Sequence, residues 1–238
     1  MYTKRIFLFI VLVAIPLLAS AQASGGQIRR PGKKQSSTVR HRSVTQSNVP
    51  PKMLSCPNDN HPHMIDLGLP SGTKWACCNL GASTPEQRGD YYRWGETKPV
   101  KEGDTDATYP YKNVDIGNNI AGTKYDAATA NWGASWRMPT EDQIMELVDN
   151  CTYKWTMQNG QEGCKVMGRN GGTIFLPASG YRGCSSGRLG NVDILGYCWS
   201  SSSYVGTGHA YRLIFDSNGC DCGSNYRAFG FPIRPVAK

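Results

Sequence analysis

The chain has 238 residues, with 26 basic and 18 acidic side chains and a formal net charge of +8. Residues 22–55 hold seven of the basic residues and no acidic one, whereas residues 56–238 carry 17 basic and 18 acidic residues. The positive charge therefore belongs to one segment, which excludes a strongly basic folded domain.

The N-terminus has the features of a secretory signal peptide. Two basic residues precede an apolar run at residues 6–18, and Ala19-Ser20-Ala21 supplies the small residues that signal peptidase recognises. The run is too short for a comfortable membrane span, and no later segment approaches one. We therefore expect a signal peptide at 1–21, cleaved between Ala21 and Gln22. The mature protein is then expected to be secreted, periplasmic or at the cell surface, with no membrane span.

The segment that follows is expected to be a disordered basic linker at residues 22–55. It is rich in Ser, Gln, Thr, Gly and Pro, and such a composition buries too little apolar surface to offset the entropy lost on ordering. A basic arm also suggests nucleic-acid binding, but export from the cytoplasm argues against a nucleic-acid partner. The remaining residues, 56–238, number about 180, which suits one folded domain.

Short apolar runs bounded by turn signals predict more strands than helices in this domain. The expected strands are residues 64–69, 73–80, 90–95, 163–168, 173–177, 196–201, 209–215 and 226–236. Residues 96–123 are polar and rich in turn signals, so we expect a long loop there. Arg169-Asn170-Gly171-Gly172 contains the Asn-Gly pair typical of a tight hairpin turn.

The clearest helix is expected at residues 140–151. Thr140 is a good N-cap, and Gln143 occupies the capping-box position three residues later. The residues at i, i+3, i+4 and i+7 form one buried stripe, namely Ile144, Leu147, Val148 and Cys151. A shorter helix is expected at 126–132. No catalytic side chain projects from the buried stripe, so the longer helix is expected to have a structural role.

Six blocks of the sequence together resemble a known family. They are, in order, MIDLGLPSGTKWACCNLGAS, GDYYRWGET, KYDAATANWGASWRMPTEDQIMELVDNC, GGTIFLPASGYR, GYCWSSS and GFPIRPV. In this order they are similar to the Fibrobacter succinogenes major paralogous domain family, whose members are secreted or surface proteins abundant in gut Bacteroidetes. The similarity covers roughly residues 63–236.

The resemblance implies a fold but no known activity. The family is considered related to C-type lectin-like folds and to the sulfatase-modifying, formylglycine-generating domains. It implies an α+β, C-type lectin-like mixed fold with short antiparallel strands, one or two helices and long irregular loops. It also implies that the two ends of the domain, 56–238, are brought together by pairing strands.

Nine cysteines in an exported chain are candidates for disulfides, namely Cys56, Cys77, Cys78, Cys151, Cys164, Cys184, Cys198, Cys220 and Cys222. The adjacent pair 77–78 and the C-x-C at 220–222 do not match zinc-finger spacing, and we expect neither a metal nor a cofactor. In the resembled family, cysteines occur at the positions of both Cys78 and Cys151. With Cys151 on the buried stripe, this leads us to expect a Cys78–Cys151 disulfide, with two buried free thiols as the alternative.

Two patterns suggest catalysis, and both are weak. Residues 183–187 match G-x-S-x-G and are followed by Asp193 and His209 in hydrolase order, but no helix follows the serine as a nucleophile elbow requires. Formylglycine-generating enzymes bind copper through two cysteines near the chain end, where Cys220 and Cys222 lie, although C-x-C is closer than the spacing of that family. We therefore expect no catalytic residues.

Binding residues are expected in the loops. Tyr204 and Tyr226 lie in or beside Gly/Ser-rich segments where a ring can stack on a sugar, and Arg182 can bond hydroxyls or an anionic sugar through its planar guanidinium. The predicted function is a secreted or surface-exposed, non-catalytic binding module for a glycan or a surface protein. The alternatives are a formylglycine-generating-type oxidase and a purely structural surface protein.

Overall fold

The computed structural model describes residues 64–204 and 208–237. The expected signal peptide, its cleavage point between Ala21 and Gln22, the expected linker and the start of the expected domain lie outside the described residues. None of the helices in the described part is long and apolar enough to cross a membrane. The described residues form an α+β structure of short antiparallel strands and two α-helices, as the sequence predicts.

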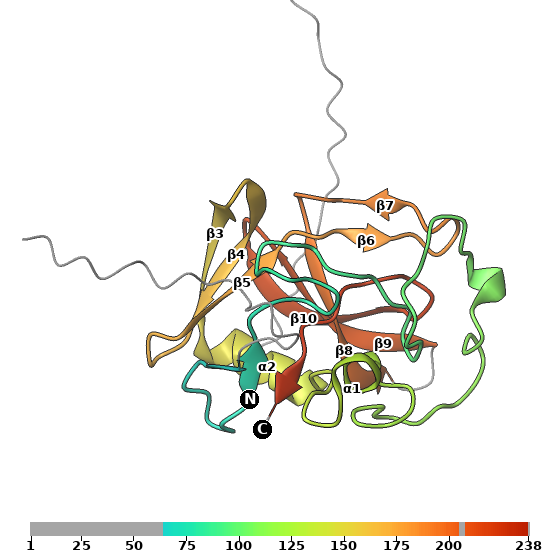
Figure 1. The fold of residues 1–238 in the computed structure, drawn as a ribbon, viewed down its shortest axis with the longest axis horizontal. Coiled ribbons are helices and arrows are strands. Elements are labelled where there is room, and N and C mark those ends of the chain that lie inside the picture. The colour runs from blue at the N-terminus through green and yellow to red at the C-terminus, as the bar shows by residue number, and fades with distance from the viewer. Residues whose placement is uncertain (1–63, 205–207, 238) are drawn as a thin grey trace, which may run out of the picture. The chain divides into compact units, whose positions relative to one another are not determined.

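The strands of the described residues form three three-stranded sheets and a two-stranded one, all antiparallel (Figure 1). The sheet that joins the two ends of the described chain consists of β1 (Met64–Asp66), β2 (Lys74–Ala76) and β11 (Val236–Ala237). A second sheet consists of β3 (Thr152–Gln158), β4 (Gln161–Met167) and β5 (Thr173–Pro177). A third consists of β8 (Gly196–Tyr204), β9 (His209–Asp216) and β10 (Gly219–Tyr226). The small sheet pairs β6 (Tyr181–Arg182) with β7 (Leu189–Gly190).

The first and last strands meet on β2, as the resemblance implies. β2 pairs with β1 on one side and with β11 on the other, and both partners meet it at Trp75. Figure 1 shows β1 and β11 close together, at the two ends of the colour range. Arg234, which is fully buried, fastens this sheet to its surroundings, because its guanidinium donates to Asn79 Oδ1 and to the carbonyl oxygens of Ala76 and Phe175.

Both predicted helices are present. The longer, α2 (Glu141–Asn150), begins at the capping box formed by Thr140 and Gln143, which satisfies backbone N–H groups at the start of the helix. The shorter, α1 (Ala127–Trp132), is capped by the Asp126 carboxylate, which accepts from the backbone of residues 128 and 129. The same buried carboxylate accepts from the N–H of Met138, and it therefore ties α1 to the segment that leads into α2.

The main core lies where α2 packs on the β8–β9–β10 sheet and on the inner face of β3–β4–β5. Ile144 and Leu147 of α2 share one cluster of buried side chains with Leu213 and Phe215 of β9. The partly buried Val148 and Cys151 pack against the same cluster, so the four-residue stripe predicted from the sequence faces the core. Burial of this stripe, more than intrinsic helix propensity, holds a ten-residue helix in place.

Two predicted strands do not form as expected, and four observed strands were not predicted, namely β3, β6, β7 and β10. Residues 90–95 contribute only an isolated bridge from Tyr92 to Phe231, and the strand expected at 226–236 is replaced by β10, which ends at Tyr226, and by the short β11. β3 was missed although its sequence, TYKWTMQ, has the alternation of apolar and polar residues that is typical of a strand. The turn between β4 and β5 follows the prediction, and Gly171 adopts the positive φ of 82° that a glycine permits.

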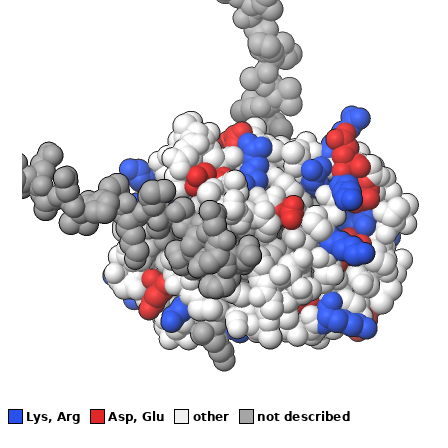
Figure 2. All heavy atoms as spheres, in the orientation of Figure 1, with Lys and Arg blue, Asp and Glu red and all other residues white. Residues whose placement is uncertain are grey.

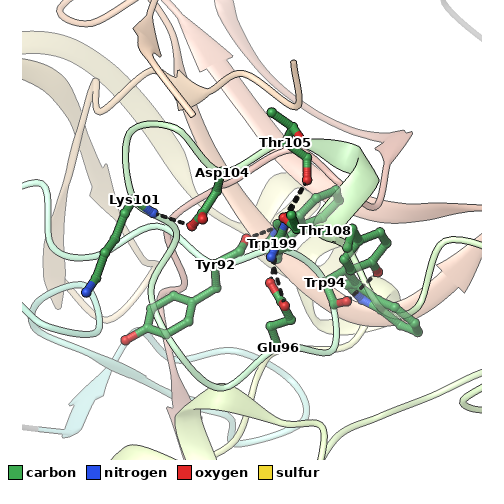
Figure 3. A network of polar contacts seen from close by, with 10 residues as sticks. Tyr92, Trp94, Glu96, Lys101, Asp104, Thr105, Thr108 and Trp199 are labelled. Atoms are coloured by element: carbon green, nitrogen blue, oxygen red, sulfur yellow. Dashed lines mark hydrogen bonds and ion pairs between the residues drawn. The ribbon is translucent and has the colours of Figure 1, made fainter. Parts of the chain in front are cut away.

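The long loop after β2 is held by buried polar contacts. Arg93 bonds both carboxylate oxygens of Glu96 and reaches the Thr105 carbonyl oxygen and the Thr108 hydroxyl. Figure 3 shows this network next to Trp94 and Trp199, where the Trp199 indole donates to the Tyr92 carbonyl oxygen at 2.8 Å. A loop without regular strands is therefore fixed by side chains that satisfy its backbone.

Candidate functional site

Three aromatic side chains form a row across one end of the β8–β9–β10 sheet. Tyr204 of β8 pairs with His209 of β9, and His209 pairs with Tyr226 of β10. Directly paired residues of antiparallel strands point to the same face of a sheet, so the three rings lie side by side. Tyr211, two residues after His209, lies on the same face, and its ring is 5.2 Å from that of Tyr204. We call these four residues the aromatic row.

The aromatic row is open to solvent while its rings are held by neighbours. Tyr204 is 40% exposed, and the other three members are partly buried. The His209 and Tyr226 rings are 6.0 Å apart. Glu141, the first residue of α2, accepts a hydrogen bond from the Tyr211 hydroxyl, and partial burial raises the pKa of this carboxyl. The row thus combines exposed aromatic surface with a carboxylate.

Contacts from the opposite face fix the row in place. Arg227, directly after Tyr226, donates to the His209 carbonyl oxygen at 3.1 Å and to the Ser203 hydroxyl, and its guanidinium lies 4.2 Å from the centre of a Trp94 ring. Lys112, which pairs with Asp106 at 2.7 Å, also bonds Tyr226. These contacts order the ends of β9 and β10 before a ligand binds, so binding costs less conformational entropy.

Of the three binding residues expected from the sequence, the structure brings two together. Tyr204 and Tyr226 stand at the two ends of the row, although they lie at strand ends and not within loops. Arg182 belongs to β6, and its backbone exchanges hydrogen bonds with Gly230. Its guanidinium donates to the Gly187 carbonyl oxygen at 2.7 Å and lies over the Tyr91 ring. These contacts give Arg182 a role in holding the β6–β7 hairpin.

His209, Tyr211 and Glu141 were not predicted as binding residues. The sequence does place His209 and Tyr211 in one strand, and their spacing of two puts them on one face. Their contact with Tyr204, by contrast, depends on the register between β8 and β9, which shifts by a bulge between Trp199 and Ser203. A single sequence does not show where a bulge shifts the register between two strands.

The G-x-S-x-G stretch is a hairpin turn and not a nucleophile elbow. Residues 183–187 connect β6 to β7, and their backbone docks on the long loop through bonds from the N–H groups of Gly103 and Asp106. A Cβ at Gly187 would lie 2.1 Å from the Lys101 carbonyl oxygen, which explains the glycine there. Asp193 pairs with Arg88, whereas His209 lies in the aromatic row.

Cys220 and Cys222 lie on the inner face of β10, packed against the main core. Burial raises the pKa of each thiol to about 12, so both are protonated at neutral pH. Copper ligation requires thiolates, and this environment opposes them. Within residues 64–204 and 208–237, no three His, Cys, Asp or Glu side chains are grouped to hold a metal ion.

The expected Cys78–Cys151 disulfide is not formed. No two cysteines of the described residues are joined to each other. The Cys78 thiol donates to the Ala82 carbonyl oxygen at 3.3 Å, in a small cluster with Cys77, while Cys151 packs against the main core at the end of α2. The predicted pair was wrong, because the apolar stripe shows only that Cys151 points inward and does not show which cluster of buried side chains it joins.

A shallow polar depression lies between residues 81–90 and the β3–β4 turn. Arg88 bonds Asp193 and Gln161 there, and Glu86 accepts from Asn159 at 2.8 Å. These hydrogen bonds outweigh the effect of burial and lower the pKa of Glu86. Because its polar groups already satisfy one another, the depression offers less to a ligand than the aromatic row does.

The distribution of surface charge does not indicate a particular class of ligand. On the face shown in Figure 2, basic and acidic side chains lie close to one another, and residues 56–238 carry nearly equal numbers of both. No protein-family model, curated protein or solved structure matches the chain. The chemistry of the site is therefore argued from its own residues.

Proposed function

We propose that this chain is a secreted or surface-exposed, non-catalytic module of the C-type lectin-like type, and that it binds a glycan through the aromatic row. One observation carries the proposal: the strand register sets Tyr204, His209 and Tyr226 side by side on one open face. Adjacent strands lie about 4.8 Å apart, so the row spans on the order of 10 Å. That length suits an extended ligand of more than one sugar ring.

The chemistry of the row fits a carbohydrate. A sugar ring presents weakly polarised C–H groups on its faces, and these pack favourably on the electron-rich face of an aromatic ring. The hydroxyls at its rim need hydrogen-bond partners, which the Tyr204 hydroxyl and the Glu141 carboxylate can provide. Tyrosine also has few rotatable bonds, so it loses little side-chain entropy when a ligand binds.

The alternative as a formylglycine-generating-type oxidase has weaker support. It requires Cys220 and Cys222 to bind copper as thiolates, yet both are partly buried against the main core and have a raised pKa. The row, by contrast, presents the Tyr204 ring at 40% exposure. The position of the aromatic side chains therefore favours binding over this oxidation chemistry.

The first test is a glycan array probed with the exported protein. We expect retention on a subset of glycans. Copper-dependent oxidation of a cysteine-containing peptide, with no retention on the array, would instead support the oxidase. A protein inactive in both assays would support a purely structural role.

A variant series then locates the site. Tyr204→Ala is expected to weaken binding to a retained glycan by about tenfold, the effect of losing one well-placed aromatic contact. Tyr204→Phe keeps the ring and is expected to retain most of the affinity. Ile194→Ala is the matched control, because Ile194 is exposed to 64% outside the row. Equal affinity of Tyr204→Ala and wild type would place the glycan elsewhere.

A further inference from the structure

Three cysteines from different elements converge in the main core. Cys164 comes from β4, Cys220 from β10 and Cys151 from the residue that ends α2, and all three belong to or pack against one cluster of buried side chains. They surround Tyr153 of β3, whose hydroxyl donates to the Leu147 carbonyl oxygen at 2.6 Å. Thiols that converge from separate elements are the arrangement in which a disulfide would join them.

Strand register shows which thiols face one another. Cys164 pairs with Trp155, and Tyr153 pairs with Val166, so Cys164 and Tyr153 share the inner face of the β3–β4–β5 sheet. Cys220 lies on the inner face of β10 and is hydrogen-bonded to Tyr153. Cys164 and Cys220 therefore both lie beside Tyr153, on two different sheets.

Cys151 and Cys222 have different surroundings. The charged neighbours of Cys151 are Glu146 and Arg169, at the partly exposed end of α2. Cys222 shares the inner face of β10 with Cys220, and the charged groups that act on it are Glu141, Arg212 and Asp221. Cys164 and Cys151 both act on Cys220, but Cys164 is buried on the inner face of β4, whereas Cys151 is only partly buried at the end of α2.

We propose that Cys164 and Cys220 are an oxidisable pair, which forms a disulfide between β4 and β10 when the protein meets a disulfide oxidant. In the structure both are thiols. The bond forms by thiol–disulfide exchange: one thiolate attacks the oxidant's disulfide and releases one oxidant thiolate, and the second thiolate then attacks the protein sulfur of the mixed disulfide and releases the other. Two thiols lose two protons and two electrons, and the oxidant leaves as two thiols. This step does not depend on the proposed glycan binding.

The bond would have a defined structural effect. β4 belongs to one sheet and β10 to another, and their residues are separated by more than 50 positions in the sequence. A covalent link between them restricts the unfolded chain and fixes the sheet of β10 to the sheet that carries Tyr153. Because Cys164 is buried and Cys220 partly buried, exchange is expected to be fast during folding and slow in the folded protein.

The test is refolding of the full chain in a buffer of oxidised and reduced glutathione, followed by tryptic peptide mapping without reduction. Cys164 lies in the peptide 155–165, Cys151 in 138–154, and Cys220 and Cys222 together in 213–227. We expect 155–165 to be linked to 213–227. We also expect the midpoint of thermal unfolding to rise on oxidation and to return on reduction with dithiothreitol.

Two matched variants show whether Cys220 or Cys222 is the partner of Cys164. Cys222→Ser is expected to keep the link, because Cys220 and not Cys222 is hydrogen-bonded to Tyr153, whereas Cys220→Ser is expected to abolish it. Three results would overturn the proposal: a link from 213–227 to 138–154, a bond within 213–227, or an unlinked 155–165 in refolded wild-type protein. Because the wild-type map decides these outcomes, the proposal remains testable even if Cys220→Ser fails to fold.

Discussion

One face of the β8–β9–β10 sheet is covered by α2 over part of its length and is open beyond the first residue of that helix. Under the helix, Leu213 and Phe215 are buried to 0% and 1% exposure. Beyond it, Tyr204 is 40% exposed, and Tyr211 contacts Tyr204 and the Glu141 carboxylate at the helix start. The same strands thus supply core at one end and an exposed aromatic surface at the other.

The difference shows that the position of α2, and not the composition of a strand, decides whether a side chain of this sheet joins the core or the exposed surface. β10 is rich in small and polar residues, GCDCGSNY, yet Cys220 and Cys222 pack against the core because α2 lies over them. The larger ring of Tyr226 on the same face remains partly exposed. A binding surface arises where the helix stops, and the four predictions that follow would break or sharpen this distinction.

The largest expected contrast is in thiol reactivity. In the reduced protein, burial raises the pKa of Cys220 and Cys222 to about 12, so the thiolate fraction at pH 8 is on the order of 1 in 10,000. Both are expected to react with iodoacetamide at least about a thousandfold more slowly than an unperturbed thiol of pKa about 8.5. Because the folded pKa is raised, the rate should increase about tenfold per pH unit above 8. Mass spectrometry of tryptic peptides measures the rates, with the same protein in denaturant as control. Equal rates in both conditions would show that α2 does not protect this end.

The next contrast is in stability. Leu213→Ala removes a fully buried side chain beneath α2 and is expected to lower the free energy of unfolding by about 2–5 kcal/mol, through lost burial and the cavity left behind. Urea denaturation followed by circular dichroism measures this value. A loss below 1 kcal/mol would contradict tight packing at the covered end.

A smaller effect is expected at the boundary between the two ends. Thr140→Ala removes the side-chain acceptor for the Gln143 N–H, 3.2 Å away, and breaks the capping box at the helix start. The expected loss is about 1 kcal/mol in the free energy of unfolding. Thr140→Ser retains the acceptor and serves as the control in the same denaturation experiment. If the two variants lost equal stability, the cap would not be the cause.

The smallest effect is expected at the open end. Tyr204→Ala removes an exposed ring from the end of β8 and is expected to change the free energy of unfolding by no more than about 0.5 kcal/mol. The same urea titration measures it beside Leu213→Ala. A loss as large as that of Leu213→Ala would mean that the row is a second part of the core and is not free to bind.

Much of the local structure could be predicted from the sequence. The cap and apolar stripe of α2, the start and end of α1 and the bounds of β5 follow from residues within a few positions of one another. The strand expected at 90–95 does not form, because Tyr92 and Trp94 are buried by contacts with distant segments and not by a regular sheet. Aromatic residues in a short run predict burial more reliably than they predict a strand.

The candidate site could be predicted only in part. Tyr204 and Tyr226 stood out because each lies near Gly- and Ser-rich sequence, but Arg182 did so for the same reason and has a structural role. Sequence position cannot distinguish a half-buried arginine that bonds a carbonyl from one that faces a ligand. The distinction needs the partners of the side chain, which come from elsewhere in the chain.

By itself, the sequence determined the helix with its capping box, the tight turn at 169–172 and the mixed class of short antiparallel strands with two helices. These depend on neighbouring residues, whose interactions exist before the chain folds. Only the tertiary structure decided that Tyr204, His209 and Tyr226 lie in one row, and that Cys164 and Cys220 meet at Tyr153 while Cys78 and Cys151 stay apart. Each of these contacts depends on the register and packing of distant segments, which side-chain periodicity within one segment does not specify.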